Sequence, residues 1–176
     1  AEGGGFFLTA DDGEALLLRQ KIFYDAAIPS GNSVAFFVLT TLFRLTGNTA
    51  FKTSAAALAR AMRPRLTDHA AGYAFFLCGL SQMLARASEV TIAGDPDSPD
   101  THALARAVNE RYLPEAAMVL RPAPDADGDE PDIVALAPFT RYQLPVNGQA
   151  AAHVCRGGSC QPPTTDVKKM LELLGG

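Results

Sequence analysis

Three consecutive segments between residues 34 and 87 repeat apolar side chains at helical spacing, and this pattern constrains the fold more than any other feature. The first segment, residues 34–46, is apolar on nearly every side, which is typical of a helix packed against several neighbours. The second and third, residues 49–62 and 68–87, each carry one apolar stripe. Because short connections join them, we expect antiparallel helical hairpins in the first half of the chain.

Helix-stop and helix-capping residues set the expected limits of these segments. Gly47 can adopt the left-handed conformation that ends the first helix. Pro64 is expected to follow the end of the second helix, since proline cannot continue the hydrogen-bonding pattern. Asp68 can cap the third helix. Cys78 lies within that apolar third helix, and we expect it in the core.

The region before the first helix suggests a β-hairpin. Residues 6–9 and 15–19 are largely apolar and flank an Asp-Gly step, which suits a tight turn.

The second half of the chain changes pattern and predicts a small α/β segment. Strand, helix and strand in succession indicate a parallel crossover unit, so we expect a largely parallel sheet. The acidic, proline-rich residues 122–131 are expected to form a solvated loop. The expected elements are a strand at 89–94, a helix at 100–113, strands at 117–120 and 151–155, and a helix at 165–174 capped by Thr165-Asp166. The fold class is therefore mixed α and β, divided into residues 1–88 and 89–176.

Composition limits the classes of partner. The chain has 176 residues and a formal net charge of −4, which gives no electrostatic reason to expect nucleic acid or an anionic membrane surface. It has no apolar run of about 18 residues that could span a bilayer, and its amino terminus lacks the pattern of a secretion signal. We therefore expect a cytoplasmic protein and predict no cofactor.

The loop before the first helix is the best candidate for a ligand site. Asp25, Ser30, Asn32 and Ser33 gather there with Gly31, where the N–H groups of a helix start are unpaired, an arrangement that suits an anionic or hydroxyl-rich ligand. The alternative is that Asn32 or Ser33 caps the helix and nothing binds. Residue types alone favour this second interpretation.

Cys155 and Cys160 lie close together across a glycine turn, beside Arg156. Such a pair could support redox exchange or half of a metal site. No second cysteine pair or closely spaced histidines complete a zinc set, so no metal is predicted. An odd count of three cysteines favours reduced, structural thiols by default.

Six short runs resemble the carboxy-terminal part of the thioredoxin-domain-containing protein family that includes bacterial proteins and the spermatogenesis-associated homologue. The most specific are Ile-Pro-Ser-Gly-Asn-Ser at 28–33 and Cys-Gln-Pro-Pro-Thr-Thr at 160–165. The others are residues 4–7, 9–14, 24–25 and 155–156.

The resemblance implies an origin and two functions. Members of that family resemble a thioredoxin-like domain followed by a six-hairpin (α/α) toroid of the glycosidase type, so residues 1–88 are expected to be the end of such a toroid. In related toroids the pocket lies among hairpin loops, which implies carbohydrate near Phe6, Phe7, Asp25, Ser30, Asn32 and Ser33.

The alternative is a non-catalytic scaffold that docks the thioredoxin-like domain, with Cys155 and Cys160 as redox candidates. Whether the chain is an enzyme, and which reaction it would catalyse, does not follow from these patterns. An incomplete toroid would leave the helix at 34–46 partly uncovered, and we therefore expect self-association.

Overall fold

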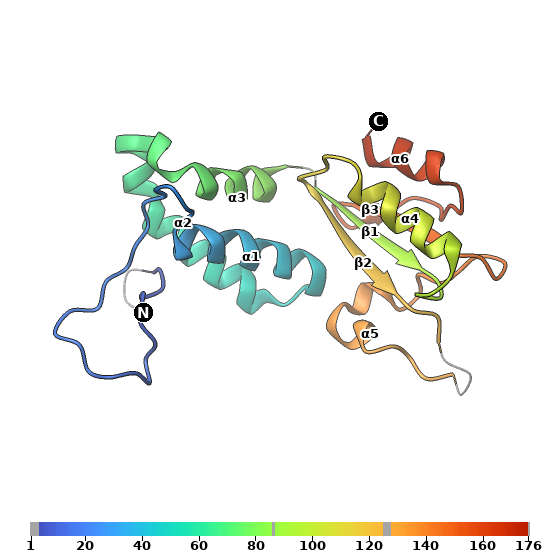
Figure 1. Cartoon of the computed structure of the whole chain (residues 1–176), viewed down its shortest axis with the longest axis horizontal. Helices are drawn as coiled ribbons and strands as arrows, with labels where there is room; N and C mark the ends of the chain where they lie inside the picture. Colours follow the sequence, from blue (N-terminus) through green and yellow to red (C-terminus); the bar gives the residue numbers. More distant parts are fainter. Residues whose placement is uncertain (1–3, 86, 125–127, 176) are drawn as a thin grey trace. The chain divides into compact units, whose positions relative to one another are not determined.

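The computed structural model describes residues 4–85, 87–124 and 128–175. The chain divides into two compact units, residues 1–84 and 85–176 (Figure 1). The first unit is helical and the second combines helices with a sheet, so the predicted mixture of helix and strand is confirmed. The domain boundary at residue 88 stays a prediction. Residues 125–127 of the predicted acidic loop lie outside the described residues.

The first unit is built around α1 (Gly31–Thr46), which packs against both α2 (Thr49–His69) and α3 (Ala74–Leu84). The rings of Phe36 on α1 and Phe76 on α3 stack with centroids 4.2 Å apart. Gly79 allows this approach, because an added Cβ would lie 2.8 Å from the Phe36 ring. The core is completed by the buried side chains of Phe23, Ala55, Leu58 and Met62.

The limits of α1 and α2 agree only in part with those predicted from the sequence. Gly47 ends α1 with a φ of 69°, as predicted. The prediction that Asn32 or Ser33 caps α1 is wrong, because Ser30 is the capping residue and accepts a hydrogen bond from the Ser33 N–H. The predicted end of α2 before Pro64 is also wrong, since the helix continues to His69. Leu66, beyond the proline, packs against the same core, and this contact favours the longer helix.

The predicted third helix at 68–87 is broken into parts. Asp68 belongs to the end of α2, and the 3-10 helix η1 (Ala70–Tyr73) separates α2 from α3. The break occurs where Gly72 lies against the ring of Tyr24, so close that a Cβ on Gly72 would overlap it. Asp25 replaces Asp68 as the cap of α3, accepting hydrogen bonds from the N–H groups of Phe75 and Phe76.

The predicted β-hairpin at 6–19 is wrong, because no strand forms there and only a turn remains at residues 11–12. Both arms are continuous apolar runs, and such runs need a sheet buried on both faces. An isolated two-stranded hairpin is marginal in water. The described part of the first unit contains no other strand, so the segment is an irregular arm, joined to the start of α1 where the Phe6 N–H donates to Asn32.

The second unit contains a four-stranded mixed sheet in the order β2-β1-β3-β4. β1 (Ser88–Ala93) pairs parallel with β2 (Ala116–Arg121), as the predicted crossover through α4 (Pro99–Asn109) requires. The prediction of a largely parallel sheet is wrong, because β3 (Ala151–Arg156) runs antiparallel to β1 and to β4 (Ser159–Cys160). The connection from β2 returns at the same end of the sheet, where Ala93 is opposite both Arg121 and Ala151.

The two faces of this sheet differ in character. One face is apolar and packs against α4 and α6 (Val167–Gly175) through Val90, Ile92, Ala152, Val154, Leu104 and Met170. Asp166 caps α6 as predicted, because its carboxylate accepts from the Lys169 N–H. The other face carries Thr91, Arg121, His153 and Cys155, all buried. The segment with α5 (Ile133–Leu136) and η2 (Pro138–Thr140) supplies its hydrogen-bond partners.

Within the part of the chain that the structure describes, no helix has both the length and the apolar character needed to cross a membrane.

Candidate functional site

Cys155 and Cys160, the two redox candidates, form a disulfide between β3 and β4. They lie directly opposite each other in the ladder. Gly157 and Gly158, with φ angles of 55° and 82°, form the two-residue turn that joins the strands, as a type I′ hairpin requires. The expectation of reduced thiols is therefore wrong for this pair, because the turn brings the two side chains together.

The two cysteines differ in exposure. Cys155 is the inner residue, with 4% of its surface exposed, whereas Cys160 is exposed at the edge of the sheet. An incoming thiolate must reach the sulfur it attacks, so access favours attack at Cys160.

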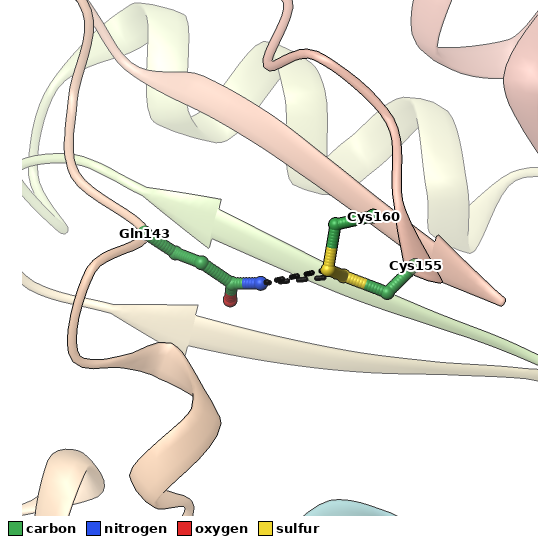
Figure 2. Close-up of a disulfide and its surroundings, with 3 residues drawn as sticks. All are labelled: Gln143, Cys155 and Cys160. Carbon is green, nitrogen blue, oxygen red and sulfur yellow. Dashed lines mark hydrogen bonds between the residues drawn. A yellow bond between two sulfur atoms is a disulfide. The ribbon is translucent and has the colours of Figure 1, made fainter. Parts of the chain in front are cut away.

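Gln143 is the neighbour that the sequence analysis missed. Its Nε2 lies 3.3 Å from the Cys155 sulfur and 3.8 Å from the Cys160 sulfur. Figure 2 shows this nitrogen directed at the disulfide and the amide oxygen turned away from it. That Oε1 atom is buried and has no hydrogen-bond partner among the described residues. No motif identifies Gln143, because the fold of the connection between β2 and β3 brings it there.

His153 lies two residues before Cys155 on the same face of β3. Burial lowers the pKa of its imidazole and the nearby Arg121 guanidinium lowers it further, while the hydrogen bond to the Leu144 carbonyl opposes both. His153 Nε2 lies 2.9 Å from that oxygen, so the ring carries its proton on Nε2. Thr91, opposite His153 on β1, has a buried hydroxyl with no partner among the described residues.

Arg121 contributes the one buried guanidinium that the structure places on this face. It donates hydrogen bonds to the carbonyl oxygens of Thr140, Pro122 and Arg141 at 2.9, 3.0 and 3.2 Å. Burial lowers the pKa of Arg121, and Glu130 partly offsets this effect. The hydrogen bonds to Thr140 and Arg141 thus hold the covering segment against the sheet.

The predicted ligand loop forms a hydrogen-bonded junction inside the first unit. Asp25 accepts from the Ser30 N–H at 2.8 Å and caps α3. The Ser30 hydroxyl lies 2.9 Å from both the Phe23 carbonyl and the Ser33 hydroxyl. Burial alone would raise the pKa of Asp25, but hydrogen bonds from Ser30, Ser33 and the α3 start lower it. The polar atoms of the loop therefore bind one another.

Asn32 connects this junction to the amino-terminal arm. Its Oδ1 accepts from the Phe6 N–H at 2.6 Å, and its Nδ2 donates to the Phe6 and Ile22 carbonyl groups at 3.0 and 2.7 Å. Asn32 is almost fully buried. Its side chain thus fixes the backbone that carries Phe6 and Phe7.

Phe7 borders an open pocket of about 630 Å³ between the arm and α2. The Arg19 guanidinium lies 4.2 Å and the Lys21 ammonium 4.6 Å from the centre of its ring, and such cation–π contacts stabilise exposed aromatic rings. Arg19 also forms an ion pair with Asp11 at 2.6 Å. The pocket therefore combines aromatic, cationic and carboxylate side chains.

The remaining candidates do not form a site. Among the described residues, no group of three His, Cys, Asp or Glu side chains is placed to hold a metal ion. Cys78 is a free, exposed thiol, so its predicted place in the core is wrong. It lies on a face of α3 turned away from the Phe36–Phe76 stack, because only one side of this apolar helix faces the core.

The chain is similar to a protein known from three mammals. It is 31% identical to spermatogenesis-associated protein 20 of Homo sapiens, and 30% identical to the proteins of that name in Rattus norvegicus and Mus musculus. These matches cover 98–99% of this chain, but the chain spans only about a fifth of each relative's length, 21–22%. No family model matches the chain. No solved structure matches it either.

The buried His153 predicts a loss of stability in mild acid. A lowered pKa means that the folded state holds His153 neutral, whereas the unfolded chain protonates it near pH 6.5. The free energy of unfolding is therefore expected to fall as the pH drops below about 6.5. Urea unfolding of the whole chain at pH 7.5 and 5.5 measures this change. His153→Gln keeps a donor for the Leu144 carbonyl without the titration, so an equal loss in this variant would contradict the assignment.

Proposed function

We propose that the second unit is a thiol–disulfide exchange partner for a dithiol protein of the thioredoxin type. The observation that carries the proposal is a disulfide between one exposed cysteine, Cys160, and one buried cysteine, Cys155, whose sulfur faces an amide donor. Disulfides of cytosolic proteins are usually catalytic or redox-sensing. The cytoplasmic location expected from the sequence therefore agrees with a redox function.

The exchange proceeds through two balanced steps. A thiolate of the partner attacks the Cys160 sulfur, the Cys155–Cys160 bond breaks, and the bond electrons leave on Cys155 as a thiolate. The second thiol of the partner, as its thiolate, then attacks the mixed disulfide and releases Cys160. The partner ends as a disulfide and the hairpin as a dithiol, so two electrons have moved from the partner to this chain.

The hairpin suits a reversible exchange. The Gly157-Gly158 turn and the backbone ladder hold β3 and β4 together independently of the disulfide. The two sulfur atoms therefore remain neighbours after reduction, and holding reactants together favours re-formation of their bond. Such a pair can pass electrons without a large change of fold.

A trapping experiment tests the exchange. The oxidised chain is mixed with a thioredoxin-like protein whose second active-site cysteine is replaced by serine, so that the mixed disulfide cannot resolve. We expect a covalent adduct through Cys160, mapped by mass spectrometry, because this is the exposed residue of the pair.

The free thiol supplies the matched control. Cys78→Ser removes the exposed thiol outside the hairpin and is expected to leave the adduct unchanged. Cys160→Ser is expected to abolish it. If adducts form equally with Cys160→Ser, or with no variant at all, the redox proposal is wrong.

We propose as a second candidate that the pocket beside the arm binds a carbohydrate-like polyol. It is supported by the pocket of about 630 Å³, by the exposed ring of Phe6, and by the Asp11–Arg19 pair that can exchange hydrogen bonds with hydroxyl groups. In this proposal Phe7 contacts the ligand, while Asn32, Asp25, Ser30 and Ser33 position the arm. Their polar atoms already bind protein groups.

Titration with mono- and disaccharides tests the second candidate. We expect binding at millimolar concentration by calorimetry or ligand-observed NMR, and at least a tenfold loss in Asn32→Ala, because the Phe6 backbone loses both of its hydrogen bonds to Asn32. Thr53→Ala, an exposed change on α2, is the control. Absence of binding by every saccharide in the panel would rule the candidate out.

We also propose that the first unit belongs to a toroid-type helical array and associates with itself when isolated. The proposal is supported by the helical hairpins and by the large apolar side chains that the arm exposes, including Leu8, Leu17, Leu18 and Ile28. Light scattering over a hundredfold range of concentration measures it. A monomer throughout that range would contradict it, and Leu17→Ser is expected to weaken any association.

A further inference from the structure

We infer that the Gln143 amide controls the exchange by stabilising Cys155 as the leaving thiolate. This inference rests on the proposed redox function and adds a residue with a specific task. It explains why a glutamine lies buried against a disulfide, although sulfur in a disulfide is only a weak hydrogen-bond acceptor. The amide N–H donates a stronger hydrogen bond to a thiolate than to the sulfur of the disulfide that the structure contains.

The distances distinguish the two sulfur atoms. The Gln143 Nε2 atom is closer to Cys155, at 3.3 Å, than to Cys160, at 3.8 Å. When the bond breaks, negative charge appears on the sulfur that leaves, and a hydrogen bond to a charged acceptor is stronger than one to a neutral acceptor. The N–H group is therefore already placed for charge on Cys155.

The unpartnered oxygen of the same amide favours the reduced state of the cysteine pair. Gln143 is 7% exposed, and its Oε1 has no hydrogen-bond partner in the described part of the chain. A buried acceptor without a donor destabilises the state that contains it. In the dithiol state the Cys155 S–H becomes a donor, and a rotation of the amide about its last bond lets Oε1 accept from it. Gln143 thus favours the dithiol over the disulfide.

The charged groups around Cys155 oppose one another. Glu89 lies opposite Cys155 in the β1–β3 ladder and is half-buried, so its carboxylate disfavours a second negative charge. His153, on the same face, is held neutral by burial, while Arg121 beyond it is bonded to three carbonyl groups. Among the described residues, the N–H of Gln143 is therefore the donor that lies against the Cys155 sulfur.

The rate of reduction by dithiothreitol tests the inference in the whole chain without a protein partner. Gln143→Met keeps the apolar volume and removes the donor, and we expect reduction to be about tenfold slower. The reduction potential is expected to become more negative in the same variant. Glu89→Gln removes the opposing charge and is expected to react faster. A slower Gln143→Met reaction cannot come from a disturbed fold, because unfolding would expose the disulfide and speed its reduction.

A monothiol locates the attacked sulfur. With glutathione as the probe, we expect the mixed disulfide on Cys160 in the natural sequence, and a share of it moved to Cys155 in Gln143→Met. Gln149→Met is the matched control, because this exposed glutamine lies in the same connection, and its rate is expected to stay unchanged.

Two outcomes separate this inference from the proposed function. Equal reduction rates for the natural sequence, Gln143→Met and Gln149→Met would overturn the role of Gln143 and leave the exchange with a thioredoxin-like partner standing. Failure to trap that partner, together with a slowed Gln143→Met reaction, would overturn the proposed function and support the role of Gln143.

Discussion

The antiparallel pairing of β3 with β1 is the constraint on which the second unit depends. Alternation along paired strands places Val154 and Ala152 on the face covered by α4 and α6, and His153 and Cys155 on the other. A register shift by one residue would exchange the two sets and bury the polar one in the apolar core. The same pairing therefore creates the core and the environment of the disulfide, and neither can change without the other.

The first unit depends on a comparable junction of polar groups. The carboxylate of Asp25 joins the start of α1, through the Ser30 N–H, to the start of α3, through Phe75 and Phe76. Asn32 joins the arm to the same junction through two hydrogen bonds with the Phe6 backbone. The polar groups of the loop predicted to bind a ligand therefore form hydrogen bonds within the protein. The loop instead fixes the arm, whose aromatic side chains line the pocket.

The elements with strong periodicity were predictable, whereas their interruptions were not. The α1 helix with its glycine end, the parallel β1–β2 unit and the capped α6 follow from local patterns. The break after α2 requires Gly72 to meet Tyr24, which is distant in sequence. The failed hairpin and the exposed Cys78 share a cause, because a continuous apolar run shows that burial is favourable without showing whether a neighbour exists to cover it.

The sequence by itself determined the helical first half, the change to α/β structure in the second half and the closeness of two cysteines across a glycine turn. Only the tertiary structure decided the direction of β3, the disulfide between a buried and an exposed cysteine, and the approach of Gln143. The physical reason is the distance in sequence between the residues that interact. Helix stripes, caps and tight turns are local properties of neighbouring residues, whereas burial and hydrogen-bond partners depend on segments that meet only when the connection between β2 and β3 folds over the sheet.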